Sequence, residues 1–118
     1  ERPEETIAEL VRGAFLEELD DELPHSLAVV VDSIEYPADN RTGEGYDGKI
    51  DVMVSVYVER DSQKPIIIGK GASHLVRVKK KLRTPVNRIV GGKARLDLHV
   101  KVAKGWQSDP KQLEKLGF

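Results

Sequence analysis

Cysteine is absent from this chain of 118 residues, which excludes a disulfide framework, a thiolate zinc site and a cysteine nucleophile. Aromatic residues make up only 5% of the sequence, and their wide spacing excludes a base-stacking platform like that of the RNA recognition motif. The sequence has no apolar run of membrane-spanning length and no signal-peptide pattern. With 39% hydrophobic and 33% charged residues, we expect a cytoplasmic protein that forms one domain over residues 1–118.

Two nucleotide-binding motifs are also absent from the glycine turn at residues 66–75, IIIGKGASHL. A P-loop would need glycine at position 64 and Ser or Thr at position 71, where the chain has Lys64 and Gly71. A dinucleotide fingerprint over the same glycines would need Gly or Ala at position 74, which is His74. Two interpretations stay open: an ordinary turn from a strand to a helix, or a short Gly-x-x-Gly-like loop whose amides and Lys70 bind a sugar-phosphate backbone.

Side chains suited to catalysis or metal binding are sparse. Ser73 and His74 have no acidic residue near them in the sequence, so they do not suggest a nucleophile and base with an orienting acid. The three histidines, His25, His74 and His99, lack metal-ligand spacing. We therefore predict neither a catalytic nor a metal site, and nuclease or GTPase activity of this chain would contradict that interpretation.

Charge is segregated along the chain, although the net charge is only −1. Residues 1–62 contain five Lys/Arg and 17 Asp/Glu residues, a balance of −12, whereas residues 63–118 contain 14 and three, a balance of +11. Because a folded domain can place such halves on different faces, the second half is expected to supply a basic surface near the glycine turn. The alternative is that the two halves neutralise each other across a shared surface.

Strand-like segments and loops indicate a small sheet. Four segments are rich in β-branched residues or alternate between apolar and polar residues: 26–35, 49–60, 65–68 and 93–104. Residues 37–48 contain several glycines and are expected to form a loop between the first two strands.

Helical spacing predicts helices before and after these strands. A first helix is expected over about residues 7–19, with Thr6 as its N-cap. Ser73 is expected to cap a second helix, and Pro85 to stand at the start of a third one, which glycines from Gly91 onward end. Together the elements predict an α+β fold with helices packed on one face of a small sheet.

Four segments carry a resemblance to a known family: DELPHSLAVVVDSI, YVERDSQKPIIIGKGAS, RLDLHVKVAKGW and DPKQLEKLGF. They lie between about residue 21 and residue 118, and they resemble the C-terminal type II KH domain of Era-type GTPases, which are ribosome-assembly factors. The resemblance implies a three-stranded sheet with helices packed on one face and a Gly-x-x-Gly-like loop between a strand and a helix. It also implies a structural role for Trp106 after the last strand.

The resemblance implies the RNA-binding part of such a protein, without its GTPase domain. The sequence contains neither Gly-x-x-x-x-Gly-Lys-[Ser/Thr] nor Asn-Lys-x-Asp, so we expect no enzymatic activity and no cofactor in this chain; GTP and Mg²⁺ belong to the full-length family. The expected partners are the single-stranded 3′ end of 16S rRNA, the 30S ribosomal subunit during its assembly and, through the full-length protein, the inner face of the membrane. A monomer is expected. The alternative is a protein-docking module on the KH scaffold with weak or no RNA binding.

The family's loop implies an RNA site made of backbone amides, a lysine and an apolar groove. The expected RNA contacts are Ile67, Ile68, Gly69, Lys70, Gly71, Ala72, Ser73, His74, Arg77 and Lys80. Ile67 is expected to face the groove, and His74 and Arg77 are candidates to contact an exposed base, with a solvated surface role as the alternative for His74.

Two residues depart from the family's pattern. Ala72 replaces the last glycine of the loop, and a positive φ there would cost about 1 kcal/mol. Pro85 falls inside the family's next helix. It is expected to end the preceding helix near Arg83 or to leave an irregular join before a shortened helix.

Overall fold

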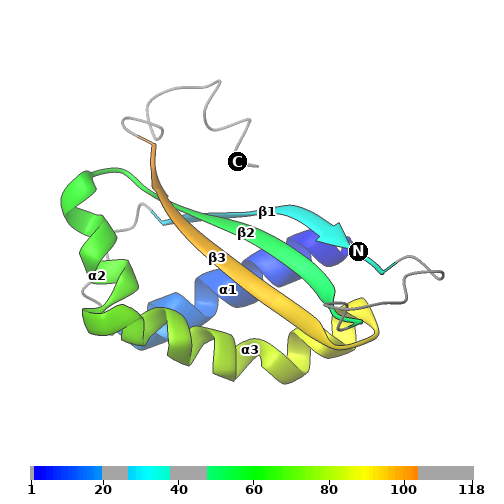
Figure 1. The fold of residues 1–118 in the computed structure, drawn as a ribbon. Coiled ribbons are helices and arrows are strands. Elements are labelled where there is room, and N and C mark those ends of the chain that lie inside the picture. The colour runs from blue at the N-terminus through cyan, green and yellow to red at the C-terminus, as the bar shows by residue number, and fades with distance from the viewer. Residues whose placement is uncertain (1, 20–26, 38–47, 104–118) are drawn as a thin grey trace.

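The computed structural model describes residues 2–19, 27–37 and 48–103 and has an α+β fold (Figure 1). Helices α1 (Pro3–Leu19) and α3 (Ser73–Val90) pack on one face of a sheet formed by β1 (Ala28–Glu35), β2 (Ile50–Val58) and β3 (Ala94–Val102), and the short helix α2 (Lys64–Ile68) precedes α3. The expected fold class is confirmed. His25, Trp106 and most of the expected loop at 37–48 lie outside the described residues.

The central strand of the sheet is β2. It pairs antiparallel with β1 and parallel with β3, so β3 is an outer strand, and α2 and α3 both contact it. Alternate residues of a strand point to opposite sides, and the side of β2 that faces the helices is fully apolar and buried: Ile50, Val52, Val54, Val56 and Val58. The three long strands expected from the sequence are confirmed with slightly shorter bounds.

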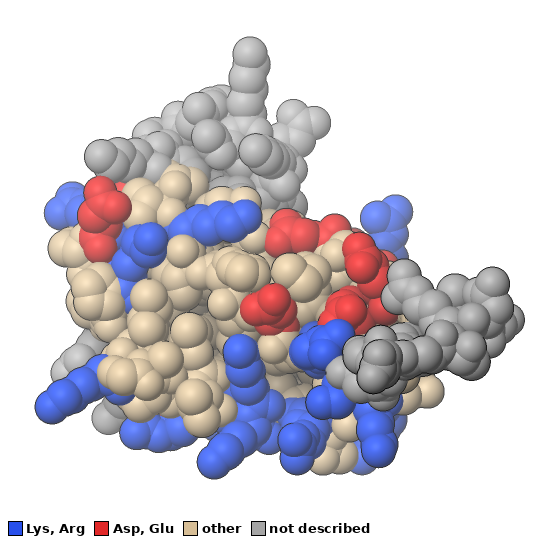
Figure 2. Space-filling view, in the orientation of Figure 1, with Lys and Arg blue, Asp and Glu red and all other residues tan. Residues whose placement is uncertain are grey.

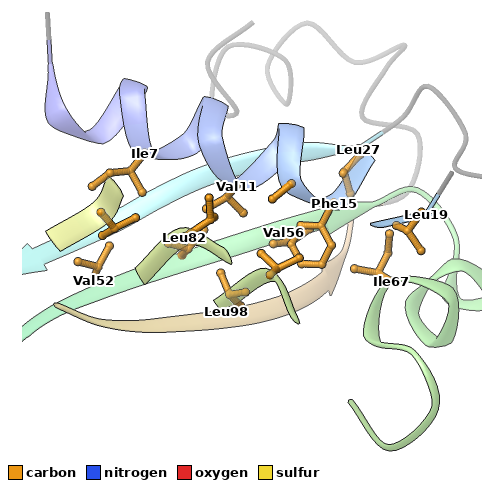
Figure 3. Packing of buried hydrophobic residues seen from close by; sticks show 14 of the residues in the cluster. Ile7, Val11, Phe15, Leu19, Leu27, Val52, Val56, Ile67, Leu82 and Leu98 are labelled. Carbon is orange, nitrogen blue, oxygen red and sulfur yellow. The ribbon is translucent and has the colours of Figure 1, made fainter. Parts of the chain in front are cut away.

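The hydrophobic core lies between the sheet and the two long helices (Figure 3). Buried side chains at helical spacing come from both: Ile7, Val11 and Phe15 from α1, and Val78, Leu82, Val86 and Val90 from α3. Each contributes about 1.5–3 kcal/mol by its burial. Helix α1 begins at Pro3, before the expected start at residue 7, because proline is favoured in the first helical turn. Thr6 therefore lies inside the helix and is not its N-cap.

The expected strand at residues 65–68 is wrong, because Lys64–Ile68 forms helix α2. Pro65 stands in the first turn of this helix, where an N–H would have no helical acceptor. Just before it, Oε1 of Gln63 accepts hydrogen bonds from the backbone N–H groups of Glu59 and Arg60, both at 3.0 Å, and so directs the chain out of β2. The glycine loop therefore connects two helices, and its expected position between a strand and a helix is wrong.

Helix α3 continues through Pro85, so the expected helix end near Arg83 and the expected join are also wrong. A proline in a helix interior costs about 3 kcal/mol, because it removes a hydrogen bond and crowds the preceding turn. The buried stripe continues on both sides of it with Leu82 and Val86, and this packing keeps the helix in one piece. Gly91, with φ of 80°, ends the helix as expected.

Candidate nucleic-acid interface

The loop between α2 and α3 is built from left-handed backbone conformations. The φ and ψ angles are 78° and 164° at Gly69, 61° and 30° at Gly71, and 61° and 24° at Ala72. The Ala72 N–H donates to the carbonyl oxygen of Gly69 at 3.1 Å and closes the turn, which leaves Lys70 exposed. Ala72 thus adopts a positive φ, and it is the only non-glycine residue in the described ranges that does so. This costs about 1–2 kcal/mol.

Gly69 is required by space as well as by its backbone conformation. A Cβ atom at this position would lie 2.7 Å from His74 Cγ and 2.8 Å from both His74 Nδ1 and Ser73 Oγ. A Cβ atom at Gly71 would meet nothing within 4 Å. The first glycine therefore packs tightly against the start of α3, whereas the second faces open space.

His74 joins the two helices that flank the loop. Its Nδ1 lies 2.9 Å from the carbonyl oxygen of Ile66, and because a carbonyl can only accept, Nδ1 carries the hydrogen. Carbonyl groups in the last turn of a helix lack helical donors, so the half-buried ring supplies one to α2 while it packs on Gly69. His74 is therefore a positioning residue for the loop. Ser73 makes no capping hydrogen bond, and its expected role as an N-cap is wrong.

Substitution of His74 can separate this hydrogen bond from the bulk of the ring. Asn places its amide nitrogen near the position of Nδ1 and Gln places it near Nε2, so only His74→Asn keeps a donor for the Ile66 carbonyl. We expect the Ala72 amide to exchange with solvent about fivefold faster in His74→Gln and His74→Ala, as the loss of about 1 kcal/mol implies. NMR-detected hydrogen exchange measures this rate. Equal protection in the Asn and Gln variants would show that the hydrogen bond does not hold the loop.

The three isoleucines before the loop point in different directions. Ile67 is fully buried and lies in the core with Leu19 (Figure 3), so the expectation that it faces a groove is wrong. Ile66 is 41% exposed and Ile68 is half-buried. The exposed apolar surface next to the loop therefore comes from Ile66 and, on α3, from Val76, which is 47% exposed.

Two basic residues of α3 face helix α1. Arg77 and Lys81, one turn apart, form ion pairs with Glu18 and Glu17 at the end of α1. The hydrogen bond from the Arg77 guanidinium lowers the pKa of the Glu18 carboxyl below its ordinary value. These contacts explain why acidic residues stand at the C-terminal end of α1, where the helix dipole disfavours them. Arg77, an expected RNA contact, is thus engaged with α1.

The four other basic residues of α3 are exposed as well. Three of them, Lys79, Lys80 and Arg83, form what we call the basic stripe, whereas Arg88, seven positions after Lys81, lies on the side of Lys81. None of the three stripe residues has a hydrogen bond or an ion pair with another residue of the described ranges. Figure 2 shows Lys and Arg side chains gathered along the lower edge of the molecule, over α3, with the acidic side chains of this view above them. The acidic and basic halves therefore neutralise each other on the side of α3 that faces α1, whereas another side of α3 forms a basic surface.

Residues 2–19, 27–37 and 48–103 show neither a metal-binding cluster nor a membrane-spanning helix. They contain no group of three side chains that could hold a metal ion, and no helix among them is long and apolar enough to cross a membrane. His99 Nε2 lies 3.4 Å from Asp97 Oδ1 on the outer strand β3.

Comparison with protein families assigns the fold. A family model described as a KH domain matches residues 22–107, a range that includes the glycine loop, α3 and all three strands. The chain belongs to the KH domain family. The loop that joins α2 and α3 is thus the Gly-x-x-Gly-like loop of a KH domain, with Ala72 in its last position.

Relatives of this KH domain are longer than the chain. It is 55% identical to the GTPase Era of Mycobacterium avium (strain 104) and 52% identical to the GTPase Era of Mycobacterium tuberculosis (strain ATCC 25177 / H37Ra), in both cases over 119 residues. Each alignment covers 100% of this chain and 38% of the relative, and it falls in the relative's C-terminal portion. The resemblance to the C-terminal KH domain of Era is confirmed.

Two solved structures share the fold. Aquifex aeolicus Era bound to GDP.AlF4− matches with a TM-score of 0.79 and 29% identity, covering 95% of this chain and 35% of that one. A structure of Era in complex with MgGDPNP and nucleotides 1506–1542 of 16S ribosomal RNA matches with a TM-score of 0.78 and 30% identity, covering 93% and 34%.

Proposed function

We propose that this chain is the RNA-binding KH domain of an Era-type GTPase and binds the single-stranded 3′ end of 16S rRNA during assembly of the 30S ribosomal subunit. The observation that carries the proposal is the loop from Gly69 to Ala72, whose left-handed backbone joins two helices in a KH fold. In KH domains this loop clamps the backbone of about four nucleotides. Support comes from the similar Era structure that contains nucleotides of 16S rRNA.

The chemistry of the loop suits phosphate groups. Successive backbone N–H groups in turns of this kind form concavities that bind anions. Lys70 is exposed in the loop and adds a positive charge. The Ser73 N–H at the start of α3 donates to the Lys70 carbonyl oxygen, and α3, a helix of 18 residues, places the positive end of its dipole beside the loop. Phosphates would thus be bound by amides, by a cation and by a dipole at once.

The bases would lie beside the loop. Ile66 and the half-buried Ile68 offer apolar surface on α2, and Val76 offers it on α3. The outer strand β3 contacts α2 and α3, and no strand of the described residues pairs with its outer edge of backbone donors and acceptors. In this proposal Ile66 takes the place that the sequence assigned to Ile67.

The remaining expected contacts have different roles. Gly69, Ser73 and His74 shape the loop, Lys70, Gly71 and Ala72 present it to phosphate, and Lys80 belongs to the basic stripe. No catalytic role is proposed for any of them, and GTP and Mg²⁺ would be bound by the GTPase part of full-length relatives. We further propose that the full-length protein is cytoplasmic, reaches the inner face of the membrane and acts on the 30S subunit as a monomer.

Fluorescence anisotropy with a short single strand that carries the 3′ end of 16S rRNA tests the proposal. We expect tighter binding to this strand than to a scrambled one. The logarithm of the association constant should fall against the logarithm of salt concentration with a slope of about −3, because about four phosphates each contribute about −0.7. Absent binding, or salt-insensitive binding that does not distinguish the two strands, would contradict the proposal and favour a protein-docking module.

A further inference from the structure

We propose that the basic stripe of α3, Lys79, Lys80 and Arg83, binds a second stretch of RNA backbone that continues from the nucleotides held at the glycine loop. The inference rests on the proposed RNA-binding function and extends its footprint along the helix. The ligand of the stripe is the phosphate backbone of a single strand, so the stripe adds affinity and not base specificity.

Helix geometry places the stripe on the flank of α3 that faces away from α1. Residues three, four and seven positions apart lie on the same side of a helix, and the stripe shares this spacing with the exposed Val76. The core side of α3 is set by Val78, Leu82 and Val86, and the side toward α1 is set by the ion pairs of Arg77 and Lys81. At 3.6 residues per turn, the stripe falls on the remaining side.

The positive charges of the stripe do not stabilise the described fold. Lys79 and Arg83 stand four positions apart, where like charges cost a helix about 0.2–0.5 kcal/mol. The stripe has no hydrogen-bonded or ionic partner among the described residues, whereas Arg77 and Lys81 both have acidic partners on α1. A bound polyanion would neutralise these three cations.

Continuity with the loop identifies this polyanion as RNA. Helix α3 starts directly after Ala72, and the rise from Ser73 to Arg83 is about 15 Å. The basic edge in Figure 2 follows α3 from the end at which it meets the glycine loop. A strand whose phosphates lie on the loop can therefore continue along the stripe, with about two more phosphates neutralised by it.

Strands of different length and a pair of matched variants test the inference. The probes are a core strand of about four native nucleotides and the same core with about six uridines added at its 5′ end or at its 3′ end. The stripe variant carries Lys79→Gln and Arg83→Gln. The control variant carries Lys81→Gln and Arg88→Gln, which removes the same charge from the other side of the same helix.

We expect the unsubstituted protein to bind one of the two extended strands about tenfold tighter than the core, with a salt slope more negative by about 1.4. Only one of the two extensions should increase the affinity, because α3 leaves the loop in one direction. The stripe variant should bind the core strand with unchanged affinity and lose the gain, and the control variant should keep it.

Three results would overturn the inference. If both extensions increased the affinity equally, the increase would come from the larger number of binding registers on a longer strand, and not from phosphates bound along the stripe in one direction. If the control variant also lost the higher affinity for the extended strand, that affinity would come from the net charge of the protein and not from the stripe. If the unsubstituted protein binds neither the core nor the extended strands, the proposed function fails and the inference fails with it; binding to the core without any gain overturns the inference alone.

Discussion

Gly71→Asp is expected to weaken RNA binding about 100-fold, or about 2.7 kcal/mol, while the domain stays folded. A Cβ atom at Gly71 meets nothing within 4 Å, and its φ of 61° is one that Asp adopts more readily than most residues. The new carboxylate would face the bound phosphate. Two like charges about 4 Å apart repel by about 4 kcal/mol at an effective dielectric constant of about 20, and salt reduces this.

The matched control is Gly71→Asn, which has the shape of the aspartate without its charge and tolerates the same backbone conformation. We expect it to bind within about threefold of the unsubstituted protein, and Lys70→Ala to lose about fivefold. Anisotropy titrations give the affinities, and urea unfolding verifies the fold. If Asn weakens binding as much as Asp, the loop does not act through charge at a phosphate. If neither substitution has an effect, RNA binds elsewhere or the chain is a protein-docking module.

Much of the sheet could be predicted from the sequence, because β3 alternates strictly between apolar and polar residues and β2 has Ile or Val at every second position. Alternation fixes both the type of element and the buried face, and the valines of β2 are buried as this pattern requires. The end of α3 was equally readable, because the left-handed conformation of Gly91 is one that glycine favours.

Helix α2 could not be read this way, because its five residues, KPIII, are too few to show a helical period and its isoleucines favour strands. Its helical signals are Pro65 in the first turn and the Gln63 side chain that bonds two backbone amides before it. The error on this element caused a second one. In a strand, alternation allowed Ile67 to face a groove, whereas in the helix Ile67 points into the core and Ile66 outward.

The pairing of charges between helices also lay beyond the sequence. Arg77 and Glu18 are 59 positions apart, and Lys81 and Glu17 are 64 positions apart. Only the packing of α1 on α3 brings them together. The sequence alone does not distinguish the paired basic residues of α3 from the unpaired ones, so it predicts an RNA contact for Arg77 and none for Lys79 or Arg83. The fold separates those that hold two helices together from those that stay available to a ligand.

Gly69→Ala is expected to reduce the free energy of unfolding by about 3 kcal/mol and to lower the melting temperature by more than about 10 °C. The φ and ψ angles of Gly69, 78° and 164°, lie in a region that is essentially restricted to glycine, where another residue costs about 1–3 kcal/mol. The added methyl group would also lie 2.7 Å from the His74 ring. Relief of that contact would move the histidine that donates to the Ile66 carbonyl.

Gly13→Ala is the matched control, because the same chemical change is expected to act in the opposite direction there. Gly13 is exposed within α1 and a Cβ atom would meet nothing within 4 Å, so alanine should stabilise the helix by about 0.5–1 kcal/mol. Urea unfolding of both variants measures the two changes. The double substitution of Gly69→Ala with His74→Ala then isolates the contact with the ring. If the steric argument holds, the double variant loses at least about 1 kcal/mol less than the sum of the two single losses. Strict additivity would mean that backbone conformation alone requires the glycine, and that His74 does not hold the loop by packing on it.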